Sequence, residues 1–195
     1  MDFKINNDVF FKLRFLDYFM ANHLGFIAGG CFKNIFKGDK IKDIDLFFEK
    51  KEDFEKAVSY FEKHKGFSKG YNNRNVIAFV CDKTKITVEL IKKTYGTPKE
   101  IISQFDFSIT KFCYYKDKET GEYSMMYHEC FFEDLTNNKL VLDDKVLFPA
   151  STFERSYKYK KYGYGLCSMS KKKLLSSLQG IDIENLSVDL YFGLD

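Results

Sequence analysis

Apolar residues recur at helical spacing in three stretches of the first half of the chain. Residues 7–22 carry Val9, Leu13, Leu16 and Met20 three or four positions apart, which predicts an amphipathic helix. A short helix is expected over 31–37, where Gly38 would stop it, and another from Phe54 to near Gly66. Thr97 followed by Pro98 indicates the start of a further helix.

Other stretches alternate apolar and polar residues or are apolar throughout, which is typical of strands. We expect strands within residues 25–30, 42–49, 75–81, 85–91, 105–115 and 122–128. The third and fourth would be joined by the polar turn CDKT, and the last two would pair across KDKETGE. This order predicts an α+β fold with a mixed sheet of about five strands and flanking helices.

The pattern changes near Pro149. The letters STFE at 151–154 have the form of a capping box, so a helix is expected from there to Gly163. A second helix should run from about Ser170 to Leu178 and end at Gly180. We therefore expect two parts, a mixed α/β domain over residues 1–147 and a small helical appendage over residues 148–195.

Composition narrows the class of protein. The 195 residues are 45% hydrophobic and 18% aromatic, which is enough for a sizeable core. The net charge of +3 permits contact with a polyanion without arguing for one. The five cysteines are widely spaced, which favours reduced thiols over a zinc or disulfide framework. With neither a signal peptide nor a long apolar run, a cytoplasmic protein is expected, in the host cytoplasm if a phage encodes it.

Two aspartates alternate along the strand expected at 42–49. Side chains two residues apart share one face of a strand, so Asp43 and Asp45 would lie together. Glu89, on the polar parity of a neighbouring strand, could add a third carboxylate. Like charges this close favour a bound cation, and three carboxylates with a phosphate substrate suit two Mg²⁺ ions, with Mn²⁺ as an alternative. A plain solvated strand is the other interpretation of the Asp-x-Asp pattern.

A glycine pair changes the balance between these interpretations. Gly29 and Gly30 end one strand and open a short helix, thirteen residues before Asp43. Glycine lets the backbone approach a ligand closely, and amide groups at such a turn can bind an anion. The sequence lacks the G-x-x-x-x-G-K-[ST] pattern, which excludes a P-loop.

Together, the letters GGCFKNIFKGDKIKDIDLFF at 29–48 resemble the signature of DNA polymerase β-type nucleotidyltransferases. Within that superfamily they are most similar to the head of CCA-adding enzymes and bacterial poly(A) polymerases. The resemblance implies that Gly29, Gly30 and Lys33 contact the triphosphate, and that Asp43 and Asp45 hold the metals. Lys33 and Asn34 stand where that family has arginine and aspartate.

Two later motifs extend the resemblance. QFDFSITKFCYY at 104–115 is similar to the ribose-binding motif, which makes Asp106 a nucleotide-binding candidate. FFEDLTNNKLVL at 131–142 is similar to a hairpin of the family, and ERSYKYKKYGY at 154–164 to the first helix of its neck domain. The last match adds Arg155 and Lys158 as nucleotide-binding candidates, although a solvated helix face explains these two equally well. The family's base-reading motif is absent, since FPAST occupies its place at 148–152.

The resemblance implies a Mg²⁺-dependent nucleotidyltransferase that moves a nucleoside monophosphate from a triphosphate to an acceptor hydroxyl. Asp43, Asp45 and Glu89 would be the catalytic and metal-binding residues. An RNA or tRNA 3′ end is the first choice of acceptor and a protein hydroxyl the second. The alternative is a module on the same fold that binds a nucleotide or a partner but has lost catalysis.

Overall fold

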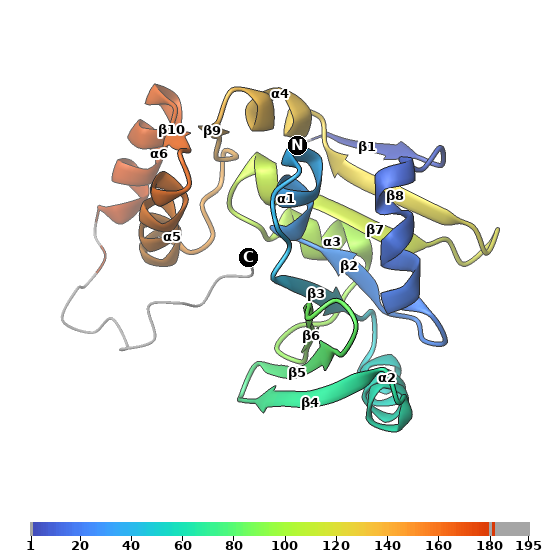
Figure 1. The fold of residues 1–195 in the computed structure, drawn as a ribbon. Coiled ribbons are helices and arrows are strands. Elements are labelled where there is room, and N and C mark those ends of the chain that lie inside the picture. Colours follow the sequence, from blue (N-terminus) through green and yellow to red (C-terminus); the bar gives the residue numbers. More distant parts are fainter. Residues whose placement is uncertain (1, 180, 182–195) are drawn as a thin grey trace.

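The computed structural model describes residues 2–179 and 181, in which a mixed sheet forms the body (Figure 1). Its eight strands lie in the order β1-β8-β7-β2-β3-β6-β5-β4. Their bounds are β1 (Phe3–Asn6), β2 (Phe26–Ala28), β3 (Asp43–Phe47), β4 (Phe67–Asn72), β5 (Val76–Cys81), β6 (Thr87–Ile91), β7 (Phe112–Lys116) and β8 (Tyr123–His128). All neighbours are antiparallel except β3 and β6, which run parallel.

The helices of the body are α1 (Cys31–Lys37), α2 (Lys51–Lys63), α3 (Pro98–Ser103) and α4 (Phe131–Thr136), with 3₁₀ helices η1 (Phe11–Met20) and η2 (Ser108–Thr110). The C-terminal part contains α5 (Pro149–Lys161) and α6 (Ser168–Leu178), which lie together beside the sheet (Figure 1). Two short strands, β9 (Lys139–Leu140) and β10 (Gly165–Leu166), pair in parallel between the two parts. In the part of the chain described, every helix is too short or too polar to span a bilayer.

The α+β fold predicted from the sequence is confirmed, with eight strands rather than about five in the main sheet. The turn at 25–48 is also as expected, because β2, α1 and β3 follow one another with Gly38 at the end of α1. The predicted Thr97 cap is present as a capping box with Glu100, which donates and accepts hydrogen bonds across the first turn of α3. The boundary at 147/148 stays a prediction.

Phenylalanine rings dominate the contacts between the helices and the sheet. Phe112 of β7 stacks on Phe32 of α1 with ring centroids 4.4 Å apart, and also contacts Phe131 at 4.9 Å. Under the other end of the sheet, Phe61 of α2 lies 4.7 Å from Phe67 and 5.3 Å from Phe79. Aromatic pairs at such distances add specific attraction to the burial of apolar area. These contacts hold α1 and α2 against the sheet. Because β3 lies between the two helices in sequence, they also fix the position of β3.

Some predicted elements differ in type from those observed. Residues 11–20 form a 3₁₀ helix rather than an α-helix, and its buried Leu13, Leu16 and Phe19 recur every third residue, the period of that helix. Residues 105–111 are not a strand, because Ser108–Thr110 form η2 and β7 begins only at Phe112. The Thr110 hydroxyl donates to the carbonyl of Phe107, a local bond that competes with sheet pairing.

The C-terminal half of the sequence contains two further corrections. The stretch similar to the family's hairpin is helical over Phe131–Thr136, as α4. The expected capping box at 151–154 is absent, since α5 begins earlier, with Pro149 in its first turn, and Ser151 is buried inside it. Proline suits the first helical position because its fixed φ is helical and it lacks an N–H.

Candidate active site

Three carboxylates from two adjacent strands form what we call the acidic wall, made of Asp43, Asp45 and Glu89. The parallel pairing of β3 and β6 sets Asp45 directly beside Glu89 and Asp43 beside Thr87. Direct partners on neighbouring strands project to the same face, and strands lie about 4.8 Å apart. Ile44 and Leu46, which alternate with the aspartates, are fully buried on the opposite face. The structure thus brings together the three carboxylates that the sequence singled out.

The acidic wall does not by itself form a closed metal site. Among residues 2–179 and 181, no three side chains of His, Cys, Asp and Glu converge closely enough to hold a metal ion. Glu89 instead accepts a hydrogen bond from the hydroxyl of Tyr71, which comes from the edge strand β4. Burial raises the pKa of Tyr71, and the neighbouring carboxylates, Glu89 first, raise it further. Tyr71 therefore stays protonated and donates a hydrogen bond to the glutamate.

Cys31 is buried at the start of α1 within the field of the same carboxylates. Burial is the main reason that the pKa of its thiol lies well above the usual value, and the charges of Asp45 and Asp43 add to the effect. Lys33 opposes the shift. A protonated, buried thiol is a poor nucleophile, so Cys31 serves here as a small packing residue.

The glycine pair shapes the turn between β2 and α1. Gly29 has a φ of +101°, a conformation that side chains rarely adopt, and its N–H bonds to the carbonyl of Phe112. Gly30 faces the cleft, and a β-carbon placed on it would lie 3.4 Å from the hydroxyl of Tyr159. Gly38, at a φ of +76°, ends α1 and turns the chain back towards β3. The short helix therefore carries the glycine turn and Asp43 to the same cleft.

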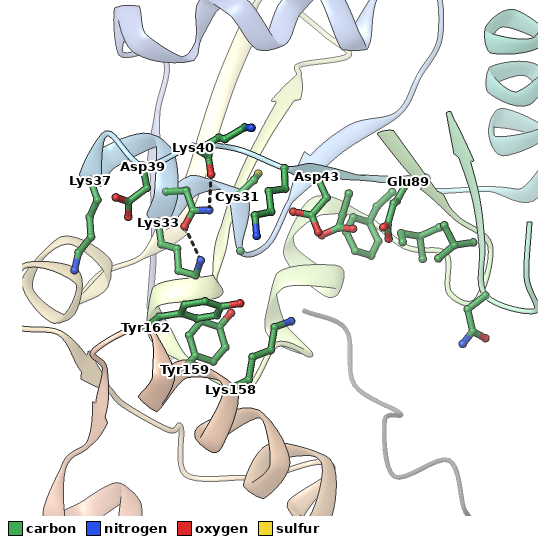
Figure 2. A pocket seen from close by; sticks show the side chains of 18 of the residues that line it. Cys31, Lys33, Lys37, Asp39, Lys40, Asp43, Glu89, Lys158, Tyr159 and Tyr162 are labelled. Carbon is green, nitrogen blue, oxygen red and sulfur yellow. Dashed lines mark hydrogen bonds between the residues drawn. The ribbon is translucent and has the colours of Figure 1, made fainter. Parts of the chain in front are cut away.

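Opposite the acidic wall stand three tyrosines of the C-terminal part, Tyr159, Tyr162 and Tyr164, which we call the aromatic wall. The ammonium of Lys33 lies 5.6 Å from the ring of Tyr159 and 5.5 Å from that of Tyr162. Lys37 lies 4.5 Å from the ring of Tyr164. Such distances are those of cation–π contacts. Figure 2 shows Tyr159 and Tyr162 next to Lys33, with Lys158 close by and Asp43 and Glu89 further along the cleft.

The two walls enclose a cleft of about 750 Å³. That volume falls in the range of sites for small molecules and cofactors. Of the residues predicted from the sequence, six line it: Gly30, Lys33, Asp43, Asp45, Glu89 and Lys158. Lys33 also donates to the side-chain oxygen of Asn34 at 2.6 Å, and Asn34 in turn donates to the carbonyl of Lys40 (Figure 2). One end of the cleft is thus acidic and the other basic and aromatic.

The other three predicted residues lie elsewhere. Gly29 is buried behind the turn and is not among the residues that line the cleft. Asp106 and Arg155 form a buried ion pair, with 2.6 Å between Oδ2 and Nη1 and side chains 3% and 2% exposed. Neither lines the cleft. Asp106, Ser108 and Thr110 do not share a strand face, since Ser108–Thr110 form η2 and Ser108 donates to the buried carboxylate of Asp134. The predicted contact of Asp106 and Arg155 with a nucleotide has no support in this placement.

Sequence comparison decides the family. The profile of Gad2, described as Gabija anti-defense 2 family protein, matches residues 3–138, well over half of the chain. The chain belongs to this family. No curated protein matches the sequence.

Solved structures show the fold. A tRNA nucleotidyltransferase with a primer tRNA and an incoming ATP analog aligns with a TM-score of 0.57 and 16% identity over 86% of this chain. A CCA-adding enzyme with ATP gives 0.63 and 14% over 92%, and the Thermotoga maritima CCA-adding enzyme with tRNA gives 0.54 and 14% over 86%. The chain spans 49%, 44% and 40% of the length of these three proteins. This member of the family therefore has the nucleotidyltransferase-like fold of the head of CCA-adding enzymes.

Sequence reasoning missed several cleft residues, above all Tyr71, Tyr164 and Lys37. Tyr71 stands in a polar stretch that reads as a turn, and its contact with Glu89 depends on the order of three strands. Tyr164 and Lys37 meet only because α1 and the C-terminal part face each other. No local pattern marks any of these three positions.

Proposed function

We propose that this member of the Gabija anti-defense 2 family is a nucleotidyltransferase that moves a nucleoside monophosphate from a triphosphate to an acceptor hydroxyl. One observation carries the proposal: a glycine turn and Lys33 meet the acidic wall in one cleft, on the fold of a nucleotidyltransferase head. Phosphoryl-type transfer depends mainly on positioning and charge neutralisation, so this small set of side chains suffices.

The donor chemistry of the acidic wall fits Mg²⁺. Its oxygens belong to three carboxylates, two of them direct partners on neighbouring strands, which repel one another without a cation. The rise that Asp43 and Asp45 cause in the pKa of both Tyr71 and Cys31 reflects this concentration of negative charge. Asp43, Asp45 and Glu89 would hold two ions together with the phosphates of a bound substrate, which would complete a site that the carboxylates alone do not close among the described residues, and the ions would supply charge neutralisation at those phosphates.

The remaining residues of the cleft bind and orient the nucleotide. Lys33, beside the glycine turn, places a positive charge where the triphosphate would lie, and Lys158 adds another from α5. The base would lie against the ring of Tyr162, which is 58% exposed. In place of the absent base-reading motif, Pro149 and Ser151 belong to the start of α5. We therefore expect the base to be held by stacking and not by its hydrogen-bonding edge.

The acceptor is proposed from the comparisons. Solved relatives of the fold carry tRNA in their complexes, which makes an RNA 3′ end the first choice. The family description names an action against Gabija, and we propose that the transfer reaction serves that action. A hydroxyl on a protein is the second choice of acceptor. Both place the protein where NTPs, Mg²⁺ and nucleic acid are available, as in cytoplasm.

A nucleotide-binding module without catalysis is the second candidate. It is favoured by the carboxylates that do not converge into a closed metal site among the described residues, and by the bond from Tyr71 to Glu89. In that case the cleft would bind a nucleoside triphosphate and transfer nothing.

Transfer of label separates the two candidates. The protein is incubated with each α-labelled NTP, Mg²⁺ or Mn²⁺, and total RNA or total protein, beside an Asp43→Asn/Asp45→Asn variant. The proposal expects label on one class of acceptor with the unaltered chain and none with the variant. Retained NTP binding with no transfer to any acceptor would establish the binding module instead.

A further inference from the structure

The edge strand β4 contains a bulge next to Tyr71. Lys69 pairs with Phe79 and Asn72 with Ile77, so β4 uses one residue more than β5 over this stretch. Within this stretch, the backbone of Gly70 packs closely against β5. A β-carbon at position 70 would lie only 3.0 Å from the carbonyl oxygen of Ala78. A bulge bends its strand and redirects the side chain it carries. Here it changes the direction of Tyr71.

The side chain of Tyr71 reaches across β5 to the acidic wall. Ala78 of β5 is the direct partner of Glu89 of β6, and so its small side chain occupies the space between Tyr71 and the glutamate. The hydroxyl of Tyr71 donates to Oε1 of Glu89. Glu89 is in turn the direct partner of Asp45. The small residues Gly70 and Ala78 thus leave room for the hydroxyl of Tyr71 to reach the acidic wall.

Tyr71 differs in this respect from the other tyrosines of the cleft. Tyr159 and Tyr164 are 2% and 5% exposed, and Tyr162 has its ring at Lys33, on the other side of the cleft. Tyr71 is 48% exposed, so a bound substrate can reach it. Its hydroxyl lies at Glu89, one of the three carboxylates that hold the metal under the proposed function.

We propose that Tyr71 is itself an acceptor, and that the protein attaches a nucleoside monophosphate to its own Tyr71. This inference rests on the proposed function. The hydroxyl oxygen of Tyr71 forms a bond to the α-phosphorus of a nucleoside triphosphate, and the bond from that phosphorus to the oxygen bridging to the β-phosphorus breaks. Pyrophosphate leaves with the bridging oxygen, and the proton of Tyr71 is released to water. The product is a phosphodiester on the tyrosine.

Attachment of one nucleotide to Tyr71 would also block further transfer by the same chain. A nucleotide attached to Tyr71 stays in the cleft, beside the acidic wall and in the path of any further acceptor. We therefore expect the reaction to stop at one nucleotide per chain, and the modified protein to transfer more slowly to external acceptors.

Intact-protein mass spectrometry followed by peptide mapping tests the inference. The full chain is incubated with each of the four NTPs and Mg²⁺ or Mn²⁺. The expected result is a mass increase of one nucleoside monophosphate, mapped to Tyr71. Tyr71→Phe and Asp43→Asn/Asp45→Asn should both lose the increase. Tyr157→Phe, at an exposed tyrosine of α5 that does not line the cleft, is the matched control and should keep it.

The outcomes separate this inference from the function on which it rests. Transfer to RNA or protein by a chain whose Tyr71 stays unmodified would overturn the self-acceptor role and leave the nucleotidyltransferase standing. An unchanged mass increase in Tyr71→Phe would also overturn it. Absence of transfer to anything, with NTP bound, would remove both. Mapping on the unaltered chain decides the matter even if Tyr71→Phe folds poorly.

Discussion

The ring of Tyr162 offers a nucleotide base an open aromatic face inside a cleft that lacks a base-reading motif. It is 58% exposed, and Lys33 holds its charge 5.5 Å from the ring centre. Stacking on such a ring accepts any base, because every base has a flat face. The nucleotide preference of this protein should therefore be weak.

Replacing Tyr162 tests this role. Tyr162→Ala should weaken the binding of non-hydrolysable NTP analogues by about tenfold, since a stacked base contributes on the order of 1–3 kcal/mol. Tyr162→Phe keeps the ring and should bind as the unaltered chain does. Calorimetric titration with all four analogues measures both effects. Equal affinities for the alanine and phenylalanine variants, or a strong preference for one base, would contradict base stacking at Tyr162.

His23 gives the fold a pH dependence that can be predicted with its sign. It lies among aromatic rings, its Nε2 donates to the carbonyl of Phe19, and its Nδ1 accepts from the N–H of Gly25. Burial lowers the pKa of His23 from 6.5 to about 4. Between these values the unfolded chain takes up a proton that the folded chain refuses. The contribution of His23 to stability is therefore present above pH 6.5 and is lost as the pH falls towards 4.

Denaturant titrations from pH 7 to pH 4 measure this contribution. The free energy of unfolding should fall by up to about 1.4 kcal/mol per pH unit on account of His23. His23→Gln keeps a donor and an acceptor without the titration, so its curve should be flatter over the same range. Parallel curves for the two proteins would show that His23 is not held neutral.

The glycine turn between β2 and α1 depends on one backbone angle. Gly29 has a φ of +101° and is buried, whereas Gly30 has an ordinary helical φ of −67°. Alanine at a positive φ is strained by about 1–2 kcal/mol. The position of the turn, and with it the distance from Lys33 to the acidic wall, is thus set by Gly29 more than by Gly30.

Gly29→Ala should lower the free energy of unfolding by about 1–2 kcal/mol and weaken NTP binding. Gly165→Ala is the matched control, because a β-carbon there meets no atom within 4 Å and should change stability by less than about 0.5 kcal/mol. Thermal unfolding and nucleotide titration measure the two effects. If Gly29→Ala is no worse than the control, the turn is not constrained as described.

Local patterns predicted the elements that depend on nearby residues. One short stretch of sequence contains both the alternation of Asp43 and Asp45 and the spacing from Gly29 to Gly38. The structure places these residues as expected. Ser108–Thr110 form a 3₁₀ turn because their hydroxyls bond to Asp134 and Phe107, one of which is distant in sequence. Tyr71 reaches Glu89 only through a bulge and the order of β4, β5 and β6. Contacts of this kind leave no local signature.

The C-terminal part is fastened to the body by the ion pair of Arg155 with Asp106, which lies between α3 and η2. Both side chains are almost fully buried, and Phe107 packs edge-on against Tyr159 with centroids 5.5 Å apart. This junction carries α5, and therefore the aromatic wall, to its place opposite the acidic wall. Asp106 and Arg155, predicted as nucleotide contacts, are thus better explained as the joint that forms the cleft.

Arg155→Met should cost about 3–5 kcal/mol of unfolding free energy, because it leaves the charge of Asp106 buried without its arginine. Nucleotide binding should weaken as well, since the aromatic wall loses its support. Lys173→Met removes a more exposed pair with Asp144, and should cost at most about 1 kcal/mol. Adding Asp106→Leu to Arg155→Met should recover most of the lost stability. Similar losses of unfolding free energy in Arg155→Met and Lys173→Met would contradict the claim that the ion pair of Arg155 and Asp106 holds the C-terminal part in place.

We propose that the acidic wall and the aromatic wall together hold an NTP while its nucleoside monophosphate is transferred to an acceptor hydroxyl. The release of pyrophosphate, measured together with NTP binding on the same preparation, tests this claim most directly. The unaltered chain should release pyrophosphate in the presence of Mg²⁺ and an acceptor. Asp43→Asn/Asp45→Asn should slow release at least about 100-fold, a loss of about 2.7 kcal/mol of transition-state stabilisation, while it still folds. Equal rates for the two proteins, or an unaltered chain that binds NTP and releases no pyrophosphate with any acceptor, would contradict it.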